Sequence, residues 1–257
     1  MAFDWRTADA AEVDLHYSPS RFSKRPLEEY VREYAELSAP YVGTTTVRQG
    51  RPLLVYIHGG YWQRLSAAES LFNAREAAEL GVSIHAVEYT LAPAATVEQI
   101  VMECIADVRG VLERAGAPRV VLAGCSAGAH LAAMCAMAPE LAGRIDVAVL
   151  LSGIYDLRPL VRTPTNDPLG LDDARAAALS PQLQGIGTFA RHAVVAVGGH
   201  EPPEFIRQSA EFADHLLSSG VDTVHSLVGD RDHFDLPYDI LRPGTFVGDH
   251  VLGRLVG

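Results

Sequence analysis

Cysteine is scarce in this chain, which has three cysteines, Cys104, Cys125 and Cys135, among 257 residues. No two of them have the close spacing of a zinc-binding pair, and an odd number cannot all form disulfides. Small buried thiols in a reducing compartment are the better interpretation, so we expect a cytoplasmic protein. A chain of this length can bury a core that needs neither disulfides nor a metal.

Basic residues and long apolar runs are also lacking. The chain has 21 Lys and Arg against 32 Asp and Glu, interspersed along the sequence, which gives a formal net charge of −11. A negative overall field argues against nucleic acid or an anionic membrane as a partner. No apolar run approaches the ~20 residues that span a bilayer. Polar Asp4, Arg6 and Asp9 follow Met1 closely, so we expect no secretory signal.

Short apolar runs alternate with helical patterns along the chain. The runs that predict strands are 53–57, 82–87, 119–123, 147–151, 193–197 and 221–228. Continuous apolar runs are typical of parallel strands that are covered on both faces. A helix is predicted from Val97, with Thr96 and Gln99 as a capping box and Gly116 at its end, and another around 205–217. This alternation predicts a doubly wound, mostly parallel α/β sheet with reactive loops at the carboxyl ends of its strands.

The pattern predicts a single domain over residues 1–257. Residues 1–40 are expected to form a helical extension, with its helix centred on 27–37. Residues 156–181 contain no strand pattern, and we expect them to form a small cap over the site.

The most informative motif is Gly124-Cys125-Ser126-Ala127-Gly128, which stands directly between a predicted strand and a helical stretch. In the G-x-S-x-G motif the serine stands on a sharp turn at the tip of a buried strand, so its neighbours must be small. This context predicts that Ser126 is a nucleophile. The N–H of Ala127 would then face the developing oxyanion.

A serine hydroxyl needs a base, and the base needs an acid to orient it. In enzymes with this motif the acid and then the histidine follow the serine in chain order. The two loops after the last predicted strands contain Glu201 and His233, which we predict to be the acid and the base. Asp230, Asp232 and Asp156 remain alternatives for the acid.

The second part of an oxyanion site comes from a loop after an early strand. His58-Gly59-Gly60-Tyr61-Trp62 follows the first predicted strand, and its adjacent glycines let consecutive N–H groups point the same way. We predict that Gly60 and Tyr61 donate beside Ala127. Tyr61 and Trp62 are also candidates for lining the substrate pocket.

A metal site is the competing interpretation of the acidic loop around His233. Asp230, Asp232 and Asp235 surround this histidine in sequence, but the spacing matches no standard set of ligands. We therefore expect neither a metal nor a cofactor.

Three segments carry a resemblance to a known family: HGGYW at 58–62, GCSAGAH at 124–130 and EPPEFIRQS at 201–209. They resemble the serine-type kynurenine formamidases (arylformamidases), which belong to the α/β-hydrolase superfamily near the hormone-sensitive-lipase esterases. Residues 17–21, 89–100 and 151–157 fit as well, so the likeness covers most of the chain. The resemblance implies an α/β-hydrolase fold and a triad at Ser126, Glu201 and His233. It departs at Glu201, where the family has aspartate.

The implied reaction is hydrolysis of N-formyl-L-kynurenine to kynurenine and formate through a formyl-serine intermediate. Tyr61, Trp62, Tyr155 and Phe234 are then expected to form apolar walls around the aromatic leaving group, and Asn166 or Arg162 a polar contact. The partner would be a small aromatic amide or ester, with the protein acting alone or as a homodimer. The alternatives are a carboxylesterase or amidase for other small substrates, and a binding protein without activity.

Overall fold

The computed structural model describes residues 3–256, and one six-stranded sheet forms its centre. The strands are β1 (Leu53–Ile57), β2 (Ser83–Val87), β3 (Val120–Cys125), β4 (Val147–Leu151), β5 (His192–His200) and β6 (Asp222–Asp232). Their order in the sheet is β2-β1-β3-β4-β5-β6, and every neighbouring pair is parallel. This confirms the predicted parallel α/β sheet. All six predicted strands are present.

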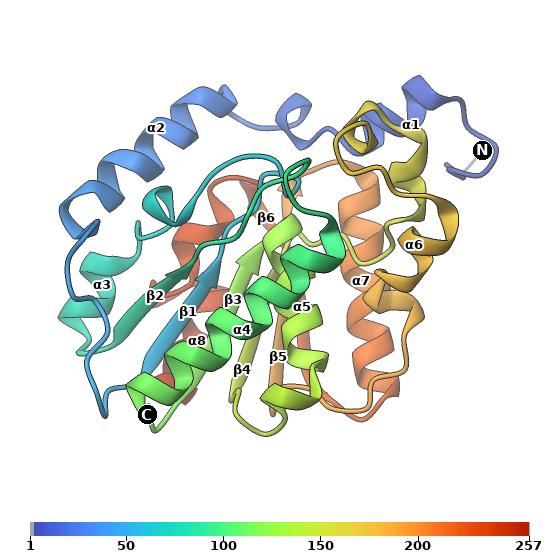
Figure 1. The fold of residues 1–257 in the computed structure, drawn as a ribbon. Coiled ribbons are helices and arrows are strands. Elements are labelled where there is room, and N and C mark those ends of the chain that lie inside the picture. Colours follow the sequence, from blue (N-terminus) through green and yellow to red (C-terminus); the bar gives the residue numbers. More distant parts are fainter. Residues whose placement is uncertain (1–2, 257) are drawn as a thin grey trace.

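Helices cover both faces of the sheet (Figure 1). They are α1 (Ala10–His16), α2 (Leu27–Ser38), α3 (Ala74–Glu79), α4 (Val97–Ala115), α5 (Ala127–Met137), α6 (Asp173–Ala178), α7 (Pro203–Ser218) and α8 (Phe246–Leu255). The apolar residues of α4, α5 and α7 belong to one core, and those of α3 and α8 to the other. The predicted capping box of Thr96 and Gln99 is present at the start of α4, and Gly116 ends it in the left-handed conformation.

The two cores follow from the alternation of side chains along each strand. In β1, Leu53 and Val55 pack into the core under α4 and α5, whereas Leu54 and Tyr56 pack into the core under α3 and α8. Every residue of β1 is therefore buried. A strand that contributes to two cores must be apolar throughout, which explains the continuous runs in the sequence.

The last two strands run further than the sequence predicts. β5 continues to His200 and β6 to Asp232, and these two residues are paired in the parallel register after an irregularity between Gly198 and His200. A Cβ on Gly198 would lie 2.6 Å from the carbonyl oxygen of Arg231, so the two backbones approach too closely there for any other residue. The pairing places the residues after the two strands, Glu201 and His233, next to each other.

The N-terminal segment contains more structure than the single helix predicted for it. The expected helix is α2, but α1 precedes it. Because α1 has seven residues and only Val13 among them is buried, its sequence has no clear amphipathic period. Both helices lie along the upper rim in Figure 1. The 156–181 segment has no strand; it consists of short 3₁₀ turns and α6.

The start of α2 is attached to the turn that carries His233 through one carboxylate. Asp232 accepts hydrogen bonds from the hydroxyl of Tyr30 at 2.6 Å and from the N–H of Lys24 at 2.8 Å. The N–H groups of Phe234 and Asp235 also donate to it, at 2.9 and 3.1 Å. Burial by itself would raise the pKa of Asp232, but these donors outweigh it and the pKa is lowered.

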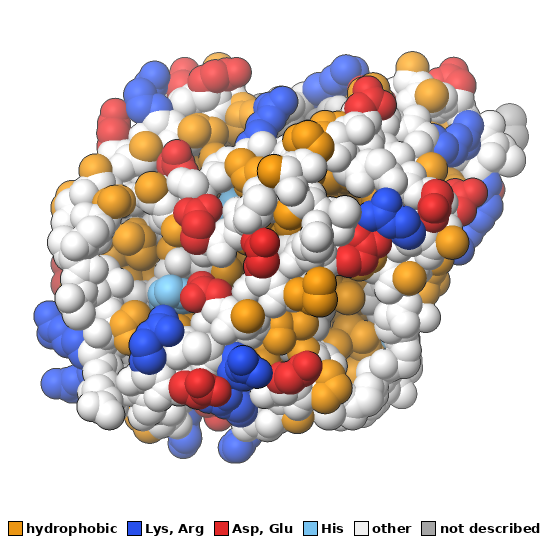
Figure 2. All heavy atoms as spheres, in the orientation of Figure 1, with side chains coloured by type: hydrophobic (Ala, Val, Ile, Leu, Met, Phe, Trp, Pro, Cys, Tyr) orange, Lys and Arg blue, Asp and Glu red, His pale blue; other side chains and the backbone are white. Residues whose placement is uncertain are grey.

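No helix among residues 3–256 combines the length and the apolar character that crossing a membrane requires. On the face shown in Figure 2, acidic and basic side chains are interspersed rather than separated by sign.

Replacing Asp232 with Asn should lower the free energy of unfolding by about 2 kcal/mol at pH 7, because a neutral amide cannot replace a charged acceptor of four hydrogen bonds. The lowered pKa gives the sign of the pH dependence. The charged carboxylate stabilises the fold above its ordinary pKa of 3.8, and this contribution is lost as the pH falls through the lower folded-state pKa. Urea unfolding of both proteins from pH 7 downward measures the difference.

Asp230→Asn is the matched control, because the side chain of Asp230 is 77% exposed. It should change the unfolding free energy by no more than about 0.5 kcal/mol. A difference for Asp232→Asn that keeps growing as the pH falls below about 4 would contradict the assignment.

Candidate active site

Ser126 stands at the junction of β3 and α5 in a backbone conformation that few residues adopt. Its φ of 60° and ψ of −125° are those of a sharp strand-to-helix turn. For a residue with a Cβ this conformation costs of the order of 1–3 kcal/mol, so the surrounding structure must hold it. The N–H of Ser126 donates to the carbonyl of Leu151 on the next strand at 2.9 Å, and its own carbonyl accepts from His130 of α5.

The small residues around Ser126 allow three segments to meet. A Cβ on Gly128 would lie 2.1 Å from the carbonyl oxygen of Ile57, and one on Gly124 would lie 2.1 Å from that of Gly128. On the opposite loop, a Cβ on Gly59 would lie 3.2 Å from the Cβ of Ser126. The glycines of the two motifs are therefore required by the close packing of the serine turn against the loop after β1.

The predicted acid and base are in direct contact. Nδ1 of His233 lies 2.7 Å from Oε2 of Glu201, and both side chains are buried. With Nδ1 donating to the carboxylate, Nε2 is the ring nitrogen left to face a hydroxyl. Ser126 and His233 line the same pocket. The structure thus brings together the three residues that the sequence singles out.

Other side chains hold this pair in place. Oε1 of Glu201 accepts from the N–H of Gly198 at 2.7 Å and from the hydroxyl of Ser152, which directly follows β4. The ring of Phe205 meets the imidazole of His233 edge to face, with 5.0 Å between centroids. Sequence reasoning missed Ser152; its one signal is its place after a central strand, at the edge where reactive groups gather.

The alternative acids are engaged elsewhere. Asp232 holds the start of α2, as described above, and Asp230 is exposed and paired with Arg231. Asp156 forms a two-point contact with Arg158 at 2.9 and 2.8 Å. Of the four candidates, Glu201 is the one whose carboxylate contacts His233.

The histidines near the site have structural surroundings. Burial lowers the pKa of His130 to about 4, and its Nε2 lies 2.8 Å from the carbonyl of Leu179. Burial also lowers the pKa of His58, whose ring stacks on Tyr89 with centroids 4.1 Å apart. Both are therefore neutral at physiological pH. Burial raises the pKa of the Cys125 thiol, which donates to the carbonyl of His233 at 3.5 Å.

The backbone N–H groups of Gly60, Tyr61 and Ala127 have no hydrogen-bond partner within residues 3–256. Ala127 is the first residue of α5, so it has no carbonyl four residues back in the helix, and the positive end of the helix dipole lies at the serine. Gly60 and Tyr61 have φ of 91° and 56°, which turns the loop after β1 sharply. These unpaired donors can stabilise a negative oxygen.

The pocket above Ser126 has a volume of about 370 Å³. The N-terminal segment, the loop after β1, the cap segment and the His233 turn all contribute to it. Its lining residues are Tyr17, Ser18, Pro19, Ser20, Leu27, Val31, Tyr34, Gly60, Tyr61, Gln63, Arg64, Leu65, Ser126, Pro164, Thr165, His233 and Phe234. Tyr61 and Phe234 are therefore where the sequence places them, and the N-terminal residues were not foreseen as part of the pocket.

Trp62 and Tyr155 do not line this pocket, which corrects the expectation for both. Trp62 is fully buried, and its ring meets His130 edge to face at 5.1 Å between centroids. Tyr155 is also fully buried and stacks on Phe212 of α7 at 4.1 Å. Both rings complete the core between the sheet and its helices. The expected polar contacts are likewise structural: Arg162 binds backbone carbonyls of the N-terminal segment, and Asn166 those of its own turn.

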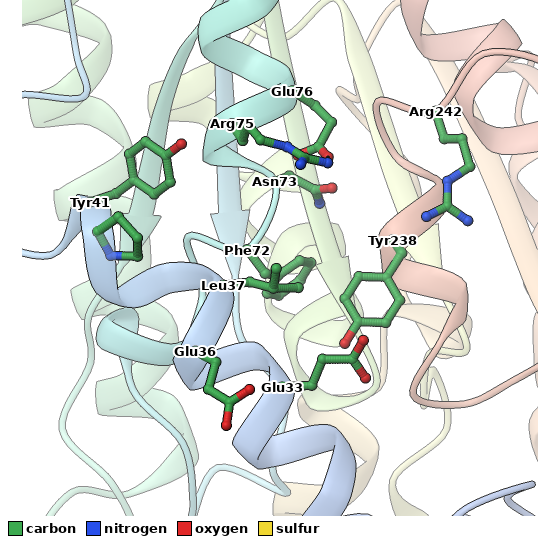
Figure 3. Close-up of a pocket in the computed structure, with 11 residues that line it drawn as sticks. Glu33, Glu36, Leu37, Tyr41, Phe72, Asn73, Arg75, Glu76, Tyr238 and Arg242 are labelled. Carbon is green, nitrogen blue, oxygen red and sulfur yellow. The ribbon is translucent and has the colours of Figure 1, made fainter.

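A second hollow, of about 340 Å³, lies between α2, α3 and the 3₁₀ turn at Leu236–Asp239 (Figure 3). Glu33 and Leu37 of α2 face it together with Arg75, Tyr238 and Arg242. None of the candidate catalytic residues lines it. We therefore place the candidate site in the pocket at Ser126.

Comparison with known proteins agrees with this architecture. Residues 54–182 match the model of a family described as having the alpha/beta hydrolase fold. The chain is 33% identical to a kynurenine formamidase of Danio rerio, over 91% of this chain and 92% of that one. It is 31% identical to a kynurenine formamidase of Salmo salar, over 90% and 92% of the two chains.

Solved structures share the fold. A proposed thioesterase from Silicibacter sp. TM1040 superposes with a TM-score of 0.81 at 23% identity, covering 96% of this chain and 99% of that one. An esterase of the bacterial hormone-sensitive lipase family superposes with a TM-score of 0.68 at 20% identity, covering 83% and 80%.

Ser126→Ala should reduce hydrolysis of an activated ester such as p-nitrophenyl acetate by at least about a thousandfold, because no other hydroxyl stands at the turn. Steady-state kinetics measure the loss, and circular dichroism checks that the fold is retained. Ser18→Ala is the control, since Ser18 lines the same pocket away from the turn. Retained hydrolysis in Ser126→Ala would contradict the assignment.

Glu201→Gln should lower kcat by about a thousandfold or more, because an amide can donate to Nδ1 and so favours the wrong tautomer of His233. The readout is kcat on the same ester. Asp230→Asn and Asp156→Asn are the matched controls and should stay near wild type. Near-normal turnover in Glu201→Gln, with a loss in one of the controls, would move the acid to that aspartate.

Proposed function

This chain belongs to the α/β-hydrolase family, in the branch that contains the fish kynurenine formamidases, and from that membership we propose that it is a serine hydrolase of aryl formamides. The substrate we propose is N-formyl-L-kynurenine, which is cleaved to L-kynurenine and formate. The observation that supports this most directly is the contact of Glu201 with His233 in a pocket shared with Ser126.

In the first half of the reaction, Oγ of Ser126 attacks the formyl carbon while Nε2 of His233 takes the hydroxyl proton. The carbonyl oxygen becomes negative and is held by the N–H groups of Gly60, Tyr61 and Ala127. Glu201 keeps Nδ1 protonated and stabilises the imidazolium. The C–N bond then breaks, His233 gives its proton to the departing arylamine, and a formyl ester remains on Ser126.

In the second half, a water molecule replaces the arylamine. His233 takes a proton from the water, which attacks the formyl ester, and the same three N–H groups hold the oxyanion. The C–O bond to Ser126 breaks, and the proton on His233 returns to the serine oxygen. Formate leaves, and the enzyme regains its starting state.

The pocket suits a small acyl group and a larger leaving group. A formyl group carries only a hydrogen beyond its carbonyl, so it needs no acyl pocket. The aromatic leaving group would lie against Tyr61 and Phe234, and Leu27 and Val31 of α2 also line the pocket. Burying an aromatic ring against such side chains is favourable through the apolar area removed from water.

The proposal predicts a preference for the formamide over a simple ester. The wild type should have a kcat/KM for N-formyl-L-kynurenine at least about tenfold above that for p-nitrophenyl acetate, because the leaving group of the ester lacks the amino-acid side chain that the pocket can bind. A panel of formanilide, acetanilide and short esters extends the comparison. Acetanilide should be cleaved more slowly than formanilide, because a methyl group makes the carbonyl carbon less electrophilic and more crowded.

Ser126→Ala is the control for every substrate, since it distinguishes enzymatic from spontaneous hydrolysis. If kcat/KM favoured the simple ester by orders of magnitude, the protein would be a carboxylesterase and the formamidase proposal would be wrong.

A further inference from the structure

We propose that Arg64 binds the carboxylate of the substrate and so selects aryl formamides that carry an acidic side chain. This inference rests on the proposed function and names a residue that determines specificity within it. It begins from the charges that line the pocket at Ser126.

The pocket has one cationic side chain and no anionic one among the residues that line it in the described chain. Seventeen residues form the lining; Arg64 is the one Lys or Arg, and Asp and Glu are absent from the set. The whole chain has a net charge of −11, so its long-range field repels anions. Within the pocket, one guanidinium and no carboxylate favour an anion, in contrast to the field of the whole chain.

Arg64 also has no partner of its own. Within residues 3–256, no side-chain hydrogen bond or ion pair involves its guanidinium, and the residue is exposed. Several other arginines are engaged: Arg207 binds Glu204 at 2.8 and 2.7 Å, and Arg175 binds Glu98 at 2.8 and 2.7 Å. A guanidinium that lines a pocket with all its donors free can bind a carboxylate through two parallel hydrogen bonds.

The backbone fixes Arg64 relative to the oxyanion donors. The N–H of Gln63 donates to the carbonyl of Gly60 at 3.0 Å, which closes a tight turn. A Cβ on Gly60 would lie 2.4 Å from the carbonyl oxygen of Arg64, so the two backbones are in close contact. The side chain of Gln63 donates to the carbonyl of Thr165 at 2.9 Å and ties this turn to the cap segment. The backbone of Arg64 is thus held in the same turn that presents Gly60 and Tyr61.

The chemical consequence is a substrate held at two ends. The formyl group lies at Ser126, and the carboxylate, which ends the amino-acid side chain ortho to the formamide, reaches Arg64. Because this carboxylate is remote from the reacting carbon, its contact is the same in the bound substrate and in the transition state. Such uniform binding lowers KM and leaves kcat nearly unchanged.

The test compares N-formyl-L-kynurenine with its carboxamide, which has the same size and reacting group but no carboxylate charge. Both release an arylamine that is followed by absorbance. We expect Arg64→Gln to lower the ratio of the two kcat/KM values, acid over amide, by about 10- to 100-fold. The change should lie in KM for the acid. Arg64→Lys should recover part of the ratio, and added salt should lower kcat/KM for the acid in the wild type more than in Arg64→Gln.

Arg51→Gln is the matched control. Arg51 is exposed and stands just before β1, at the opposite end of the strand from the oxyanion turn, so the ratio should equal that of the wild type. An unchanged ratio in Arg64→Gln would overturn the role of Arg64 and leave the formamidase proposal standing, provided the wild type cleaves both formamides. An equal loss on both substrates would also overturn it. A wild type that cleaves neither would overturn the proposed function and this inference together.

Discussion

The candidate site depends on the parallel pairing of β5 and β6 beyond the point where their apolar runs end. His200 pairs with Asp232 after an irregularity at Gly198. Glu201 and His233, which directly follow these two residues, therefore lie beside each other. That register is possible because Gly198 and Gly199 let the backbones approach to distances that a Cβ would prevent. A shift by one residue would point the acid to the other face of the sheet. The register of the two strands therefore brings the acid and the base together, and their side chains then complete the contact.

The N-terminal segment is part of the site. Tyr17, Leu27 and Val31 line the pocket, and Asp232 joins the start of α2 to the turn of His233. Another side of α2 faces the second hollow, which both polar and apolar side chains line (Figure 3). α2 thus has solvent-accessible space on both sides and is held by its hydrogen bonds to the His233 turn and by Tyr34 in the core. Asp232 therefore links α2 directly to the turn that carries His233.

Much of this architecture was predictable because local patterns carry it. The apolar runs predict the six strands, and the capping box at Thr96 predicts the start of α4. The glycines beside Ser126 predict the sharp turn, because they allow an approach that a Cβ would prevent. Trp62 and Tyr155, which were expected in the pocket but lie in the core, show the limit of such patterns. Trp62 follows Gly60 and Tyr61, which both have positive φ. Such a turn determines whether the next ring faces the pocket or the core, and the periodicity of side chains in the sequence does not reveal which. Ser152 and Arg64 escaped notice because single polar residues in loops acquire meaning only from what the fold places beside them.

The glutamate at position 201 also has a physical explanation. An aspartate at this position would hold its carboxylate closer to its own backbone by one methylene. In this chain the carboxylate turns back to accept the N–H of Gly198, three residues earlier on its own strand, while its other oxygen contacts His233. The hydroxyl of Ser152, which directly follows β4, donates to the oxygen that accepts the N–H of Gly198. With this turn, the side chain of Glu201 places a carboxylate oxygen at Nδ1 of His233. The requirement at this position is a carboxylate oxygen at Nδ1, and strand geometry together with side-chain length provides it.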